Sequence, residues 1–282
     1  MFYKTKNKLS IQKYLDNHPN LSDKTRETYL YNVKNLTFDF EMLSQVTLLN
    51  NIKKKFENPN SRSMHLNLLI LMRKQDNLQI DKLLKYRDTL REEIIVLRKE
   101  NLAELELPTF EEFKEKLDKS QGLRYLINYL FFNFGFRNKD INLKIIKKEK
   151  NLEDYEFEQK YNYLIVNKHY NAQLIINEYK TKKSFGKKII AIKDPKFLRE
   201  IKKLDLVGNF LLSTKLKKQL VDSTFNERVK SLTIDELGEV KIFKILIAHY
   251  LKNQNFDKIE ALSKSRGTSL TTILRSYNTA NT

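Results

Sequence analysis

Apolar residues recur at helical spacing through the first third of the chain. Residues 21–36 open with a Ser or Asp cap and continue with apolar side chains on one helix face. Asn58-Pro59-Asn60 introduces a second predicted helix over Ser61–Met72, and a third runs from about Ile80 to Leu102. These patterns predict an all-helical domain over residues 1–104.

The helical pattern breaks at residues 105–109, which we interpret as a linker. Pro108 fixes its own backbone and interrupts the preceding helix. Thr109 can then cap a new helix, with Glu112 as its partner three residues later. A second domain is therefore predicted over residues 110–282.

Hydrophobic periodicity changes in the second domain. Residues 161–166, 173–179 and 187–192 are short, rich in β-branched or aromatic side chains, and separated by turn residues. They predict three antiparallel strands. The fold class is then mainly α, with an α+β second domain built on a small three-stranded antiparallel sheet. Helices are predicted around this sheet at 122–134 and at about 195–204, 224–233, 240–252, 256–263 and 270–276.

Charge indicates the partner of the chain. The 282 residues contain 53 Lys and Arg against 35 Asp and Glu, a net charge of +18, which favours polyanions. The expected partner is double-stranded DNA, although coding in an AT-rich genome also enriches lysine. The N-terminus lacks a signal-peptide core and no apolar run approaches the ~20 residues of a membrane span. An intracellular protein, in cytoplasm, nucleus or virion, with no membrane contact is therefore expected.

Several classes of chemistry are excluded by composition. There is no cysteine, and the four histidines lack zinc-ligand spacing, so we expect no metal site. The six glycines form neither a P-loop nor a dinucleotide-binding motif. No cofactor is expected.

Four short motifs occur in an informative order. Leu21 to Tyr29 reads Leu-Ser-x-x-Thr-x-x-x-Tyr, and Phe134 to Leu143 carries Gly-Phe-Arg followed by an acidic residue and Leu. Lys180 lies between two predicted strands, and Gly267-Thr268-Ser269 precedes Tyr277, which stands nine positions after Thr268. In this order the chain resembles the tyrosine recombinase or integrase family, in particular integrase-like proteins of large DNA viruses and mobile elements.

The resemblance implies a reaction and a set of roles. Residues 1–104 would be the core-binding domain, and the second domain would be catalytic. Arg137 would orient the phosphate, since a guanidinium can donate two parallel hydrogen bonds. Tyr277 would attack the phosphorus to give a 3′-phosphotyrosyl intermediate, and Lys180 would protonate the departing 5′-oxygen. The family also works as a tetramer on DNA.

Three positions depart from the family pattern. Lys241 and Lys244 stand where the family has His-x-x-Arg, and Thr268 replaces a His or Trp. Lysine cannot form the bidentate fork of arginine, which would loosen the hold on the phosphate. Six basic residues complete the predicted DNA contacts: Lys24, Arg26, Arg62, Lys182, Lys183 and Arg266.

Three functions stay open from the sequence. The first is a DNA integrase or recombinase that uses Tyr277. The second is a descendant that binds DNA in an architectural, replication or packaging role and no longer cleaves it. The third is an unrelated basic helical protein, which the absence of a hairpin at 179–187 would favour.

Overall fold

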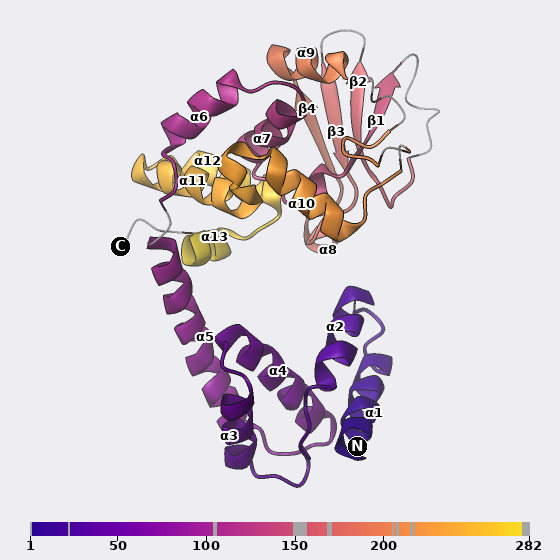
Figure 1. Ribbon diagram of the computed structural model, residues 1–282, viewed down its shortest axis with the longest axis vertical. Coiled ribbons are helices and arrows are strands. Elements are labelled where there is room, and N and C mark those ends of the chain that lie inside the picture. The colour runs from indigo at the N-terminus through magenta and orange to yellow at the C-terminus, as the bar shows by residue number, and fades with distance from the viewer. Residues whose placement is uncertain are drawn as a thin grey trace. The chain divides into compact units, whose positions relative to one another are not determined.

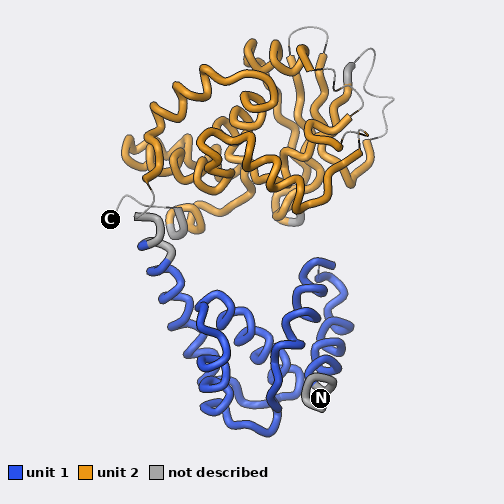
Figure 2. The backbone as a smooth tube through the Cα atoms, viewed as in Figure 1, with its two compact units in different colours: residues 1–104 blue, residues 105–282 orange. Residues whose placement is uncertain are grey.

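The computed structural model divides the chain into two compact units, residues 1–104 and 105–282 (Figure 2). It describes residues 2–21, 23–103, 106–148, 157–167, 171–204, 206, 209–214, 216 and 218–277. Each unit has a separate hydrophobic core.

Unit 1 is helical, as the sequence predicts (Figure 1). Asn58 caps one of its helices through a side chain that accepts from the backbone N–H of Asn60 and Ser61. This helix, α4, packs against the other four and buries most of its apolar residues. The elements are α1 (Phe2–Asp16), α2 (Asp23–Val33), α3 (Gln45–Lys55), α4 (Pro59–Gln75) and α5 (Asp81–Ala103).

Unit 2 is built around helix α7 (Gly122–Phe134), which is apolar on nearly every face. An all-round apolar helix has to be buried, and α7 contacts five helices of the same unit. The first of them is α6 (Phe110–Lys119), where Thr109 and Glu112 form the expected capping box. The other four are α9 (Pro195–Lys203), α10 (Asp222–Leu232), α11 (Gly238–Lys252) and α12 (Phe256–Arg266).

The sheet of unit 2 has four strands in the order β1-β2-β3-β4. The three predicted strands are present and antiparallel, as β2 (Asn162–Asn167), β3 (Ala172–Ile176) and β4 (Lys188–Ile192). The mainly helical fold class is confirmed, but the expectation of three strands is wrong. Strand β1 (Leu143–Lys148) pairs parallel to β2.

Strand β1 depends on partners remote in sequence. On its other edge it pairs with residues 209–211, where Ile145 N–H donates to Asn209 O at 2.8 Å and Leu211 N–H donates to Leu143 O at 2.8 Å. A strand that pairs in parallel is not joined to its partner by a hairpin turn, which could be recognised in the sequence. The only local indication of β1 is therefore its own six residues.

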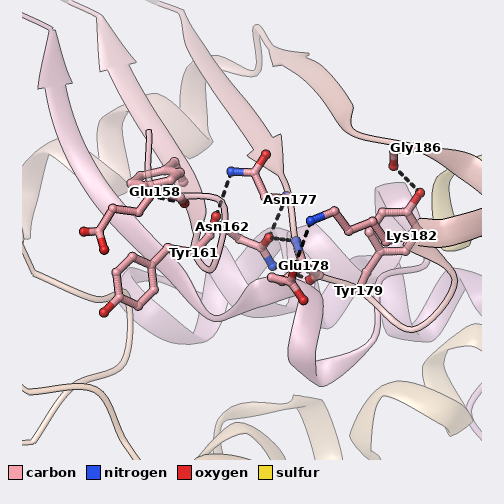
Figure 3. Close-up of polar contacts among 9 residues, drawn as sticks. Glu158, Tyr161, Asn162, Asn177, Glu178, Tyr179, Lys182 and Gly186 are labelled. Carbon is pink, nitrogen blue, oxygen red and sulfur yellow. Dashed lines mark hydrogen bonds and ion pairs between the residues drawn. The ribbon is translucent and has the colours of Figure 1, made fainter. Parts of the chain in front are cut away.

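A buried asparagine fixes the chain as it leaves β3 (Figure 3). Asn162 Oδ1 accepts from the backbone N–H of Asn177 and Glu178 at 2.8 and 2.7 Å. Its Nδ2 donates to Glu178 O and to Asp140 O, at 2.9 and 3.3 Å. The connection between β3 and β4 is thereby tied to the short 3₁₀ helix η1 (Asn138–Ile141). Tyr179 Oη closes the connection at its far end by donating to Gly186 O.

Candidate active site

Arg137 lies in the turn between α7 and η1. Gly135 ends α7 in the left-handed conformation at φ 60°, and a Cβ there would lie 2.8 Å from the Phe243 ring. The backbone N–H of Arg137 then donates to Asp140 Oδ2 at 2.9 Å. Because both ends of the turn are fixed, the Arg137 side chain leaves the turn in a defined direction.

The guanidinium of Arg137 reaches the turn after α12. Nη2 donates to Thr268 Oγ1 at 2.7 Å, and Nη1 donates to Arg266 O at 2.6 Å. The structure thus brings Arg137 and Thr268 together across 131 residues of sequence. Two groups this close can contact one and the same phosphate.

Three successive carbonyl groups at the end of α12 hold side chains from three different parts of unit 2. Ser265 O accepts from Lys188 Nζ at 2.7 Å, Arg266 O from Arg137, and Gly267 O from Thr181 Oγ1 at 2.6 Å. Helix C-termini carry partial negative charge and attract cations. The C-terminal turn of α12 therefore gathers two cations beside each other.

The lysine of this cluster is Lys188, at the start of β4, and not the expected Lys180. Lys180 is exposed in the β3–β4 connection. Lys188 Nζ lies 3.9 Å from the centroid of the Tyr179 ring and donates a hydrogen bond to Ser265 O. The correction follows from strand alternation, which directs Lys188 to the same face as Ile190 and Ile192. The alternation of side chains along the predicted strand 187–192 is the feature of the sequence that indicates Lys188.

Lys188 is a weaker base than an exposed lysine. Its pKa is lowered to about 8, mainly by burial; the charge of Asp140 opposes this shift, and that of Arg137 contributes to it. Burial also raises the pKa of Asp140, against the opposing effects of Arg137, Lys188 and Arg266. A lysine with a pKa near the working pH can give up a proton during a reaction.

Lys241 and Lys244 both lie on α11 and are half-buried. Their roles at the histidine and arginine positions of the family stay predictions.

Tyr277 is the last residue of α13 (Leu270–Tyr277), which follows the α12 turn directly. The backbone places it on this helix, but its side chain lies outside the described residues. Ser269 caps α13 by accepting from Thr272 N–H at 3.2 Å.

Arg266 is buried, which corrects its predicted role in DNA contact. The side chain is 2% exposed. Nη2 pairs with Glu239 Oε2 at 2.7 Å, and the guanidinium carbon lies 4.2 Å from the centroid of the Phe243 ring. A residue enclosed in this way cannot meet a DNA phosphate in this structure.

Arg26 and Arg62 hold helix ends in unit 1. Arg26 Nη2 donates to Leu15 O and His18 O at 3.0 and 2.9 Å, at the end of α1. Arg62 donates to Phe56 O at 2.8 Å and to a neighbouring carbonyl group, after α3. Both guanidinium groups have a structural role, so their contact with DNA stays a prediction.

The remaining predicted DNA contacts are lysines. Lys24 is exposed in the first turn of α2. Lys182 Nζ lies 2.9 Å from Glu178 Oε1, as drawn in Figure 3. Lys183 belongs to the short helix α8 (Lys182–Phe185), but its side chain lies outside the described residues.

Among the described residues, no cluster of three or more His, Cys, Asp or Glu side chains could hold a metal ion. None of the described helices combines the length and apolar character that crossing a membrane requires.

The chain is similar to solved structures but matches no family model. No protein-family model and no curated protein matches the chain. Among solved structures, the crystal structure of XerA recombinase is similar at a TM-score of 0.37 and 13% sequence identity, over 97% of this chain and 93% of that one. A likeness of this size identifies no family, so function has to follow from the residues of the site.

Proposed function

We propose that the chain cuts and rejoins DNA strands through a covalent bond to Tyr277. The observation that carries this proposal is the meeting of Arg137, Lys188 and Thr268 at the end of α12. The next helix, α13, begins three residues after Gly267 and ends at Tyr277. A phosphate-binding cation and a proton donor from different parts of unit 2 thus meet at the turn that precedes the helix carrying the phenol.

Each residue has one task in the proposed reaction. Arg137 and Thr268 hold the non-bridging oxygens of the scissile phosphate and stabilise the charge of the transition state. The Tyr277 phenol loses its proton to water as its oxygen attacks phosphorus, and the bond from phosphorus to the 5′-oxygen breaks. Lys188 donates the proton that the departing oxygen needs. A second strand reverses these steps, and Lys244 takes the second position of the phosphate clamp.

A DNA-binding protein without cleavage is the second candidate. It is favoured by the lysines at 241 and 244, since a lysine holds phosphate as a point charge and without the planar fork. In either case double-stranded DNA is the proposed partner, bound by several copies of the chain.

A nicked suicide substrate tests the cleavage proposal. The short 5′ fragment diffuses away after attack, so the protein stays covalently attached to DNA. We expect Tyr277→Phe to abolish the adduct and to leave DNA affinity within about twofold, because only a hydroxyl group is removed. Tyr31→Phe is the matched control, since Tyr31 is a 68% exposed tyrosine of unit 1.

Lys244→Arg separates the two candidates. In a slow enzyme, the restored fork should maintain or increase adduct formation. A protein that only binds DNA should give no adduct in either form. An adduct that persists unchanged in Tyr277→Phe would exclude Tyr277 as the nucleophile.

A further inference from the structure

Arg266 is a buried cation that directly precedes the Gly267 turn. Its Nη1 donates to the backbone carbonyls of Gly135 and Phe136, at 2.7 and 3.1 Å. These carbonyls belong to the two residues immediately before Arg137. A guanidinium from α12 therefore holds the turn from which Arg137 projects.

The contact between the two turns is reciprocal. Arg137 Nη1 donates to the carbonyl oxygen of Arg266 at 2.6 Å, while Arg266 donates to the backbone before Arg137. Each arginine thus binds the main chain that carries the other. Neither turn can move by an ångström without lengthening hydrogen bonds at both ends.

Helix α11 supplies the support for Arg266. Glu239 Oε2, at the start of α11, accepts from Nη2 at 2.7 Å, and Phe243 lies one turn later against the guanidinium plane. The pair is buried, with Arg266 2% and Glu239 15% exposed. The planar fork, the aromatic face and the carboxylate together fix one orientation, which an ammonium group cannot reproduce.

We propose that Arg266 is a positioning residue that sets the place of Arg137 in the candidate active site, with Glu239 orienting Arg266. The proposal rests on the proposed function for its catalytic meaning, but the placement itself does not. The class of ligand that Arg137 would then hold is a phosphodiester. The sequence predicts only a DNA contact for Arg266, since only the folded chain brings its side chain against Gly135.

Side-chain NMR of the ¹⁵N-arginine-labelled full chain tests the placement without DNA. The Nε–Hε signal of Arg137 is identified by its loss in Arg137→Lys. We expect Arg266→Lys to shift this signal and to speed its exchange with water by about tenfold or more, because the main chain before Arg137 is released. Glu239→Gln should act in the same direction and more weakly. Arg199→Met is the control, since Arg199 is 61% exposed on α9.

The rate of DNA cleavage tests whether Arg266 affects catalysis through Arg137. On the suicide substrate, Arg266→Lys should lower the single-turnover cleavage rate by about tenfold or more at DNA affinity within about twofold. The loss should not add to that of Arg137→Lys, because both changes act on the same group. Thermal unfolding confirms that each variant is folded, and Glu239→Gln serves if Arg266→Lys does not fold.

The outcomes are distinct. An Arg137 signal that stays in place in the folded variants overturns the proposal, as do additive losses of cleavage rate. A displaced signal in a chain that forms no adduct supports the placement and contradicts the proposed function instead.

Discussion

At the scale of single residues, Lys188 has a pKa well below the ordinary value of a lysine. Its amine lies among Ser265 O, the Tyr179 ring and the charges of Arg137 and Asp140. Removal from water destabilises the charged form, which lowers the pKa to about 8. The proposed proton donor therefore titrates close to neutral pH.

The pH dependence of cleavage tests this assignment. Only the protonated amine can donate, so the single-turnover rate should fall as pH rises through about 8. Lys188→Arg should keep DNA affinity and abolish this alkaline fall, because an arginine stays protonated, while lowering the rate. Lys187→Arg, at an exposed neighbour, is the control. An unchanged pH profile in Lys188→Arg would contradict the role.

The lowered pKa of Lys188 also predicts how the stability of the protein changes with pH. The folded-state pKa of about 8 lies below the ordinary value of 10.5, so between these values the unfolded chain binds a proton that the folded chain does not. The contribution of Lys188 should therefore make the protein more stable as pH rises through this window. Lys188→Met should remove that rise, which denaturant unfolding at several pH values can measure.

Local motifs indicate some of the residues that meet at the end of α12 and not others, for a physical reason. Arg137 follows a helix end that a glycine marks, and Thr268 follows another, so both stand beside turns that local sequence predicts. Position between two strands favours Lys180, whereas the direction of a side chain depends on strand alternation, which brings Lys188 to the end of α12. Burial of Arg266 depends on Glu239 and Gly135, which are remote in sequence and could not be foreseen.

At the scale of elements, the turn between α12 and α13 is the part of the site with the least space. Gly267 has φ 63°, and a Cβ there would overlap Thr181 Oγ1 and lie 3.2 Å from Lys188 Nζ. The backbone can approach the connection between β3 and β4 only because this residue has no side chain.

Gly267→Ala should therefore destabilise unit 2 and disrupt the cluster of Arg137, Lys188 and Thr268. The positive φ alone costs about 1–2 kcal/mol for alanine. Gly238→Ala is the matched control, because Gly238 has φ 72° and open space around its Cβ position. The free energies of unfolding of the two variants should differ, with Gly267→Ala lower. Equal values would show that close approach at Gly267 has no energetic weight.

Helices were easier to predict than strands in this chain. Caps and apolar periodicity are local, so α4, α6 and α7 could be expected with their starts. Strand β1 was missed because its partners, β2 and residues 209–211, lie far along the sequence. Its place in the sheet is decided by tertiary contacts, which outweigh local preference.

At the scale of the whole molecule, the two cores predict that the units fold separately. The hydrophobic clusters of the two units share no residue in the described part of the chain. Fragments 1–104 and 105–282 should each show a cooperative thermal transition. Circular dichroism and calorimetry of both fragments measure this, and loss of structure in both would mean that the units need each other to fold.

Net charge predicts how DNA affinity responds to salt. At +18, the chain should bind mainly through phosphates, so the logarithm of affinity should fall linearly with the logarithm of salt concentration. The expected slope is about −0.9 for each phosphate contacted. Fluorescence anisotropy with a labelled duplex measures it. A salt-independent affinity would contradict phosphate binding.

The hydrogen bonds of the arginines bear on how DNA could be selected. Arg26, Arg62, Arg73 and Arg266 all donate to main-chain carbonyl groups of their own unit, and lysines outnumber arginines in the sequence by 41 to 12. Reading a guanine edge in the major groove favours the planar arginine fork. A protein surface whose cations are mostly lysines would contact the phosphates of DNA and not the base edges. Target choice would then depend on how easily a DNA segment bends or widens its grooves.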